Sequence, residues 1–186
     1  MNFIILFGPP AVGKMSVGRT LSKQLGIPLF HNHMSIEPAL QFFEHGSSSF
    51  RRFVSTYRQM IFEETIVSKL DGLIFTYVWD LDSVHDHQFV EKTCNQFKDA
   101  GASVLLVELT ASLEQRLYRN TTEERLQEKP SKRNIAQSES RLLRANEKHR
   151  MNSNEKDVLP FSHLLIDNTD LTPAQVTEKV IQHLNT

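Results

Sequence analysis

The sequence predicts an α/β protein in which a parallel sheet is covered by helices on both faces. Five short apolar runs rich in β-branched or aromatic residues alternate with stretches whose apolar residues recur at helical spacing. Parallel strands need crossover connections and are buried on both sides, so this alternation favours a doubly wound sheet. At 186 residues, 39% of them hydrophobic, the chain is long enough for one sizeable core, and we expect one domain over residues 1–186.

The apolar runs and the helical periods place the elements in chain order. The expected strands are 2–7, 27–31, 72–78, 103–109 and 162–166. The expected helices are 14–25, 34–44, 49–70, 86–100, 112–120, 134–150 and 172–184. The last helix has the clearest start, because Thr172 is a suitable cap, Pro173 takes the first helical position and Gln175 completes a capping box.

Composition excludes several classes of protein. With 21 basic and 22 acidic residues the formal charge is -1, which gives no overall attraction to nucleic acid or to an anionic membrane. A single cysteine, Cys94, excludes an internal disulfide, and no paired Cys/His spacing indicates a zinc site. We therefore expect a cytoplasmic protein without a membrane segment, in which the opening run 3–7 is a buried strand and not a signal peptide.

One segment, residues 116–150, is locally basic. It holds ten Lys or Arg against five Glu, an excess of five positive charges, and its only aromatic residue is Tyr118. Two interpretations stay open: a solvated helical arm, or a mobile cover over an anionic ligand.

A phosphate-binding loop is the strongest motif. Gly8 to Lys14 match G-x-x-x-x-G-K, follow an apolar strand and open a helix. Backbone N–H groups of such a turn wrap phosphate oxygens, and the positive end of the helix dipole points at the same oxygens. We expect Lys14 to contact the β and γ phosphates. The expected nucleotide contacts of this loop are Gly8, Ala11, Val12, Gly13, Lys14, Met15 and Ser16.

From this loop onward the chain resembles the P-loop small-molecule kinases, the group of shikimate kinase, gluconate kinase and the adenylate kinases. The other matching segments are Phe50-Arg51, residues 113–119 and residues 166–169 with Thr172-Pro173. The resemblance implies a three-layer P-loop NTPase fold, with a five-stranded parallel sheet of order 2-3-1-4-5 and a helical lid at about 120–133. It also implies ATP and Mg²⁺ as cofactors.

The resemblance also implies roles for single residues. Arg116 or Arg119 would lie near the adenine, together with Asn168 of the fifth-strand loop. Arg125 would reach the transferring phosphate from the lid, where charge on the equatorial oxygens has to be neutralised. The usual metal-binding hydroxyl is replaced by Met15, and Ser16 follows one residue later, as in adenylate kinases, so Ser16 would hold the metal directly or through water.

The acceptor side departs from the family pattern. Shikimate kinases carry Asp-x-Asp after the second strand, whereas this chain has His31-Asn32-His33, so we expect an acceptor other than shikimate. The two histidines could be a base, substrate ligands or polar residues at a strand end. Asp80 is expected to end the third strand and to hold magnesium through water. His33, Asp80 and Arg51, the arginine that would grip an acidic substrate, are expected in one cleft, within an acceptor region of about 31–60.

The leading functional hypothesis is a kinase that transfers the γ-phosphoryl group of ATP to a hydroxyl or phosphate of an unidentified small molecule. A nucleic-acid end kinase is a rival, although the basic arm alternates with glutamates and lacks aromatics for base stacking. A nucleotide-binding switch without an acceptor is the second rival, kept open by the missing carboxylates after the second strand.

Overall fold

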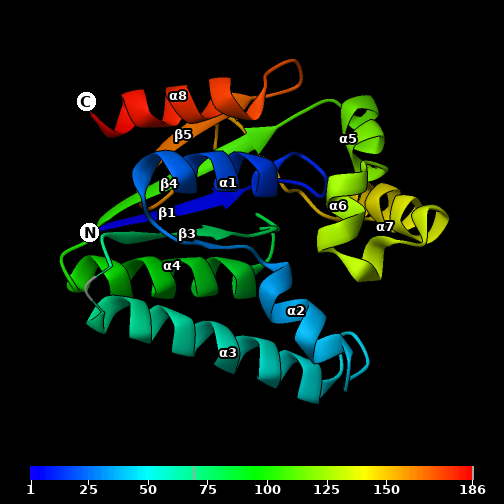
Figure 1. Cartoon of the computed structure of the whole chain (residues 1–186), viewed down its shortest axis with the longest axis horizontal. Helices are drawn as coiled ribbons and strands as arrows, with labels where there is room; N and C mark the ends of the chain where they lie inside the picture. The colour runs from blue at the N-terminus through cyan, green and yellow to red at the C-terminus, as the bar shows by residue number, and fades with distance from the viewer. Residues whose placement is uncertain (69, 186) are drawn as a thin grey trace.

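A five-stranded parallel sheet organises the computed structural model, which describes residues 1–68 and 70–185, with the side chains of residues 124 and 128 also outside the description (Figure 1). The strand order is β2-β3-β1-β4-β5, and every neighbouring pair is parallel. The strands are β1 Asn2–Phe7, β2 Leu29–Phe30, β3 Gly72–Thr76, β4 Ser103–Thr110 and β5 Ser162–Asp167. The α/β class and the order 2-3-1-4-5 are confirmed.

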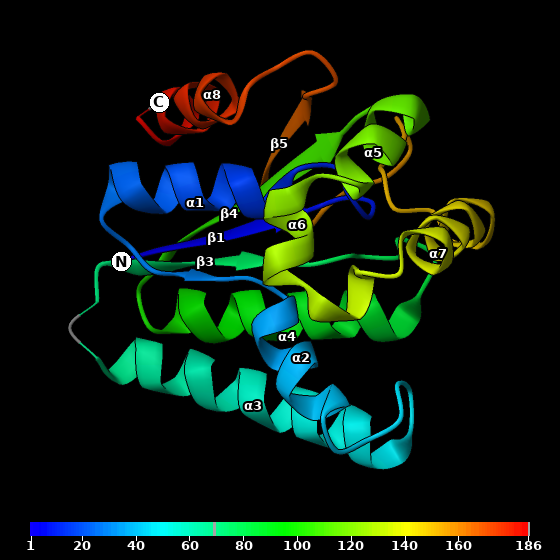
Figure 2. The same cartoon turned by 45° about the vertical axis from the view of Figure 1, so that its right-hand side comes forward.

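Helices cover both faces of the sheet, in agreement with the apolar runs (Figures 1 and 2). Side chains of β1 alternate between the two layers: Ile4 and Leu6 pack on one side, and Phe3, Ile5 and Phe7 on the other. The first layer holds α1 Lys14–Leu25 and α8 Pro173–Leu184, and the second holds α3 Ser48–Val67 and α4 Val84–Asp99. Residues 3–7 of β1 are thereby fully buried, and this removal of apolar surface from water stabilises the sheet.

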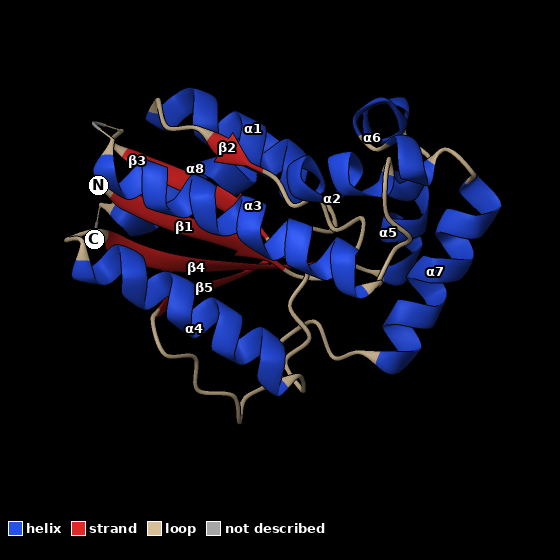
Figure 3. Cartoon of the chain, turned by 90° about the horizontal axis from the view of Figure 1, so that it is seen from below, coloured by secondary structure: helices blue, strands red, loops and turns tan. Residues whose placement is uncertain are grey.

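A third group of helices lies beyond the carboxyl ends of the strands (Figures 1 and 3). It comprises α2 His33–Leu40 on one side and, on the other, α5 Leu113–Asn120, α6 Glu123–Glu128, the 3₁₀ turn η1 Pro130–Lys132 and α7 Ile135–Lys148. We call residues 123–132, which comprise α6, Lys129 and η1, the lid. Asn120 ties this group together, because its Oδ1 accepts hydrogen bonds from Arg125 Nε (3.1 Å) and Ser138 Oγ (2.9 Å).

The structure differs from the sequence-based elements mainly at the edges of the sheet. The second strand has two residues instead of five, and the third ends at Thr76 instead of residue 78. After β3 the Asp86 carboxylate accepts hydrogen bonds from the Tyr77 hydroxyl and from the Asp80 N–H, both at 3.0 Å, which hold this segment against the start of α4. Helix α6 and η1 were not expected from the apolar pattern.

Helix ends agree with the expectations to within a few residues. The expected third helix, 49–70, ends at Val67, and residue 69 lies outside the described residues. At Thr172 the capping box with Gln175 is present. Within residues 1–68 and 70–185, no helix combines the length and the apolar character needed to cross a membrane.

Candidate active site

The phosphate loop joins β1 to α1 in a conformation that its glycines permit. Gly8 has a φ of 131°, and a Cβ there would lie 2.2 Å from the carbonyl oxygen of Leu109. Gly13, directly before α1, has a φ of 109°. Any side chain at Gly8 would collide with the neighbouring strand, so this close approach of β1 and β4 requires glycine. The loop therefore lies over the ends of the two central strands, with the amino terminus of α1 behind it.

Three side chains brace the loop from behind. Arg116 Nε donates to the Pro10 carbonyl (3.0 Å), while Arg119 Nη1 and Asn168 Nδ2 donate to the Val12 carbonyl (3.0 and 2.8 Å). Arg119 also donates to the carbonyls of Asn168 (2.7 Å) and Thr169 (3.1 Å). Because its carbonyls are held in this way, the loop could bind an anion through its N–H groups without changing its backbone conformation.

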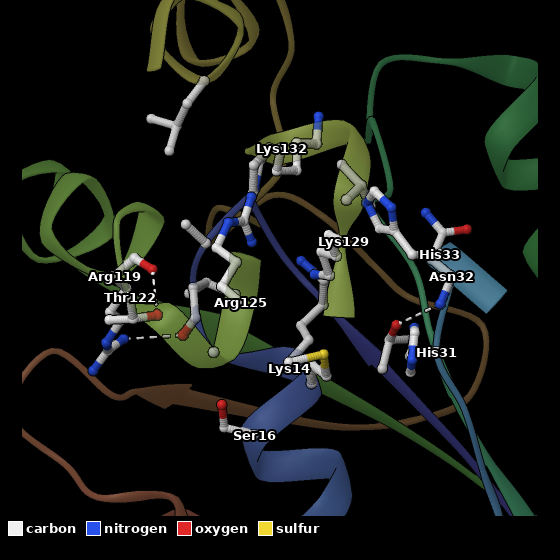
Figure 4. A pocket seen from close by; sticks show the side chains of 18 of the residues that line it. Lys14, Ser16, His31, Asn32, His33, Arg119, Thr122, Arg125, Lys129 and Lys132 are labelled. Carbon is white, nitrogen blue, oxygen red and sulfur yellow. Dashed lines mark hydrogen bonds between the residues drawn. The ribbon is translucent and has the colours of Figure 1, made fainter. Parts of the chain in front are cut away.

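A pocket of about 520 Å³ opens in front of the loop (Figure 4). Lys14 lies at its floor, and Nζ donates to the carbonyls of Gly8 (2.6 Å) and Pro9 (2.8 Å). Burial, followed by repulsion from Lys129 and Arg125, holds the pKa of Lys14 well below its usual value. An anion in the pocket would relieve this cost, because it would stabilise the charged form of the lysine.

The lid and α7 supply most of the other cations of the pocket. Besides Lys14 these are Arg119, Arg125, Lys129, Lys132 and Arg141, and the described lining residues include no Asp or Glu. Burial and then repulsion from Arg125 and Lys132 lower the pKa of Lys129 to about 7, and burial lowers that of Arg125 to about 10. The described residues offer no hydrogen bond or ion pair to the side chains of Lys129, Lys132 and Arg141. This concentration of unpaired positive charge is suited to a polyanion.

A histidine and a carboxylate face each other on α2. His33 lines the pocket, and its Nδ1 lies 2.7 Å from Glu37 Oε1, one helical turn away. Burial dominates and lowers the pKa of His33 to about 4 despite the opposing effect of Glu37. The contact at neutral pH is therefore a hydrogen bond from a neutral imidazole and not an ion pair. Because a carboxylate only accepts, Nδ1 carries the hydrogen and Nε2 keeps its lone pair.

Arg58 of α3 holds the start of α2 in place through hydrogen bonds. Its Nε donates to Ser35 Oγ (3.0 Å) and its Nη2 to Asn32 Oδ1. The guanidinium lies 5.7 Å from the ring centroids of Phe75, Tyr77 and Phe89. A buried arginine held by hydrogen bonds and ring faces is rigid. Asn32 and the neighbouring His33 are thus held at the edge of the sheet.

The overall structure is similar to solved structures of kinases. A gluconokinase from Sinorhizobium meliloti matches with a TM-score of 0.60 and 12% identity, covering 99% of this chain and 91% of the other. A sugar kinase from Janibacter sp. matches with a TM-score of 0.61 and 12% identity, covering 100% and 95%. A shikimate kinase from Acinetobacter baumannii, in complex with shikimate, matches with a TM-score of 0.54 and 18% identity, covering 100% and 93%.

The chain has the fold of the P-loop small-molecule kinases. No family model matches the sequence, and no curated protein matches it. The identities of these structural neighbours, below 20%, establish the fold, and the reaction is argued below from the pocket.

Within this P-loop kinase fold, most residues expected on the nucleotide side surround one pocket. Ala11, Val12, Gly13, Lys14, Met15, Ser16, Arg119, Arg125 and Asn168 line it, together with His31 and His33. Gly8 shapes the loop from below. Of the two arginines expected near the adenine, Arg119 lines the pocket, whereas Arg116 is buried behind the loop and donates to Asn146 Oδ1 (2.8 Å).

The structure does not bring Asp80 and Arg51 into this pocket with His33, as the sequence had led us to expect. Strand β3 ends four residues before Asp80, whose Oδ2 accepts from His149 Nδ1 at 2.7 Å beyond α7. Arg51 is exposed in the first turn of α3. Neither residue is among the lining residues that the structure describes. Thr76 and Val78 occupy the pocket wall where Asp80 was expected.

Several residues of the site escaped the sequence analysis. Lys129, Lys132 and Arg141 were counted only as part of the basic arm, although that excess of charge was the right signal. Glu37 could have been found from its spacing of four residues after His33 on an expected helix. Arg58 gave no signal, because its partners lie far apart in the sequence.

Proposed function

We propose that this protein is a kinase that transfers the γ-phosphoryl group of ATP to a hydroxyl of a small molecule that also carries an anionic group. One observation carries the proposal. A single pocket extends from the phosphate loop at Lys14 to His31 and to His33 at the start of α2, so that a donor and an acceptor would share one space. Solved structures of this fold named for gluconate, a sugar and shikimate support an acceptor of small size.

The donor half suits a nucleoside triphosphate. The glycines give the loop the positive φ angles that a phosphate-binding turn uses, and Arg119 and Asn168 line the pocket on the side of β5. Ser16, in the first turn of α1, also lines it and carries a hydroxyl, a group that coordinates Mg²⁺. Because the described lining residues include no carboxylate, Ser16 is the residue that we assign to hold Mg²⁺, which would offset the charge of the phosphates when bound.

The transfer step needs positive charge around the moving phosphoryl group. In that step the bond from the γ-phosphorus to the ADP oxygen breaks and a bond to the acceptor oxygen forms. Lys14 from the loop and Arg125 and Lys129 from the lid surround the position between donor and acceptor (Figure 4). These cations offset the charge that spreads over the equatorial oxygens, and the lid excludes water from it.

The proton of the acceptor hydroxyl requires a base, and His33 is suited to this role. Its imidazole is neutral at physiological pH, Nδ1 is engaged by Glu37, and Nε2 is left to accept a proton. A base with a pKa as low as about 4 is weak in the free protein. Bound phosphates next to Lys129 and Lys132 would reduce the repulsion from these lysines and raise the pKa of His33 toward the working range.

The acceptor half contains more positive charge than a neutral sugar would need. Lys132 and Arg141, with His45, line the pocket at the lid side, and the pKa of His45 is lowered by burial and then by these two cations. The described lining residues include no carboxylate, so nothing among them would repel an anionic group on the acceptor. We therefore assign Lys132 and Arg141 to a carboxylate or phosphate group of the acceptor.

The proposal is tested by incubating the protein with γ-labelled ATP, Mg²⁺ and a metabolite extract, and then with separate hydroxy acids, phosphorylated alcohols and neutral sugars. We expect label in an anionic product that depends on Lys14. If label enters only neutral compounds, the anionic acceptor is wrong. If no metabolite takes up label while ATP binds tightly, the kinase assignment is wrong and a nucleotide-binding switch replaces it.

A further inference from the structure

Glu37 touches both the expected base and the lid. Its Oε1 lies 2.7 Å from His33 Nδ1 and accepts from Ser131 Oγ at 2.6 Å, while Oε2 accepts from the Ser131 N–H at 3.3 Å. His33 and Glu37 belong to α2, whereas Ser131 belongs to η1 of the lid, 94 residues farther along the chain than Glu37. This carboxylate is thus a direct connection between the acceptor side and the lid.

The charges around Glu37 make this connection specific. Burial alone would raise its pKa, but hydrogen bonds from His33 and Ser131 outweigh burial and lower it. The carboxylate is therefore ionised at neutral pH and accepts all three hydrogen bonds. The other charged groups near His33 are Lys129 and Lys132, both from the lid side. Closing the lid therefore brings two cations and one serine toward a single carboxylate and its histidine.

We propose that Glu37 is a positioning residue that makes His33 an effective base only when the lid is closed, with Ser131 as the contact that reports closure. This inference rests on the kinase function proposed above. In the closed state, Ser131 holds the carboxylate in the orientation that keeps the hydrogen of His33 on Nδ1 and points the lone pair of Nε2 at the acceptor. Nε2 takes the hydroxyl proton as the new phosphorus–oxygen bond forms, and the carboxylate stabilises the resulting imidazolium.

The arrangement has a functional consequence. In an open protein the Glu37 carboxylate would lose Ser131 and gain water, and the imidazole would no longer be held in one orientation. Water entering the pocket would then meet a poorly oriented base. Coupling the base to closure therefore protects ATP from hydrolysis until the acceptor is enclosed.

The test compares Glu37→Gln and Ser131→Ala, with Glu44→Gln as a matched control. Glu44 is an exposed acid just after α2 whose side chain has no hydrogen bond or ion pair to a described residue. The first readout needs no acceptor: hydrogen exchange of residues 123–132 with a non-hydrolysable ATP analogue bound. We expect faster exchange in both variants than in the wild type and the control. Exchange equal to the wild type in both variants would overturn the coupling.

The second readout is the tautomer of His33, followed by ¹⁵N NMR of histidine-labelled protein with the same analogue. We expect the Nδ1–H form in the wild type and the control, and a larger share of the Nε2–H form in Glu37→Gln and Ser131→Ala. An unchanged tautomer in both would show that Glu37 does not orient the base. Because neither readout depends on turnover, these outcomes are separate from failure of the proposed kinase function.

The third readout is kinetic and uses a double-mutant cycle once an acceptor has been identified. Glu37→Gln is expected to lower kcat about tenfold with little change in the KM for ATP, since removing an orienting partner of a functional histidine typically costs this much. Ser131→Ala should lower kcat in the wild-type background and have no further effect when Glu37 is already Gln. Independent, multiplying effects of the two substitutions would contradict the proposed path from lid to base.

Discussion

The half of the pocket formed by the phosphate loop and the half formed by the lid are held by different kinds of contact. The loop carbonyls are held by hydrogen bonds from Arg116, Arg119 and Asn168, and Lys14 turns back onto the loop. On the lid half, by contrast, Lys129 and Lys132 have no hydrogen bond or ion pair to the side chains that the structure describes. The loop half, which we assign to the donor, is thus prepared in advance, whereas the lid half carries positive charge that an anionic ligand would compensate.

This difference indicates how the two halves would respond to ligands. A braced loop loses little freedom on binding, so its hydrogen bonds contribute to affinity at low cost. The unpaired cations of the lid half repel one another, which favours opening of the lid. The hydrogen bond between Ser131 and Glu37 opposes this opening. We predict that residues 120–133 are mobile without nucleotide and close when ATP binds, which slower hydrogen exchange in this segment on addition of an ATP analogue would show.

The largest effect is expected for Lys14→Ala, which removes the only lysine of the loop. Loss of a charged donor to the transferring phosphate should lower kcat about a thousandfold, with little change in the thermal melting temperature because Lys14 contributes little to packing. Lys23→Ala, in the exposed last turn of the same helix, is the matched control and should behave as the wild type. A folded Lys14→Ala variant with near-normal turnover would contradict the assignment of the donor half.

His33→Ala tests whether the acceptor half contains a base. We expect kcat to fall about a hundredfold, while His85→Ala, at an exposed position on α4, should have no effect. Because only neutral His33 can take a proton, the wild-type rate should fall as the pH drops through the pKa of His33. That pKa is about 4 in the free protein and is expected to be higher with phosphates bound. An unchanged kcat in His33→Ala would indicate an acceptor that is already an ionised phosphate.

Arg141→Gln tests the anionic acceptor. Arg141 lines the pocket, whereas Arg144, one turn farther along α7 and also exposed, does not. Losing one charged hydrogen bond should raise the KM for the acceptor about tenfold and leave kcat nearly unchanged, and Arg144→Gln should change neither. Equal effects of the two substitutions would mean that general surface charge, and not a specific contact, attracts the acceptor.

The smallest effect concerns the pH dependence of nucleotide binding. In the free protein the pKa of Lys129 is about 7, so the side chain loses its proton as the pH rises through 7. Bound phosphate favours the charged form, so binding should take up a proton, and affinity for an ATP analogue should fall severalfold, roughly, between pH 6.5 and 8. Calorimetry in buffers of different ionisation enthalpy measures this uptake. Lys129→Met should reduce it, leaving any uptake by Lys14 and His33, and Lys148→Met, at the exposed end of α7, should leave it intact.

The sequence alone determined the fold and the position of the phosphate loop, because their signals are local. The two-sided burial of β1 can be read from its continuous apolar run, and the loop from the spacing of Gly8, Gly13 and Lys14. The cap of α8 could also be read, since Thr172 and Gln175 act on the helix that they begin. In each case the residues that determine the conformation are close neighbours in the chain, so one sequence suffices.

Only the tertiary structure decided the acceptor half, because its contacts join residues far apart in the chain. Whether Asp80 reaches the pocket depends on the path of the chain after β3, where the Asp80 N–H donates to Asp86 of α4. Glu37 meets Ser131 across 94 residues, and no local pattern encodes that distance. Charge could be counted from the sequence as an excess in residues 116–150, but which of these cations line the pocket depends on how α5, α6, η1 and α7 pack on one another beyond the sheet.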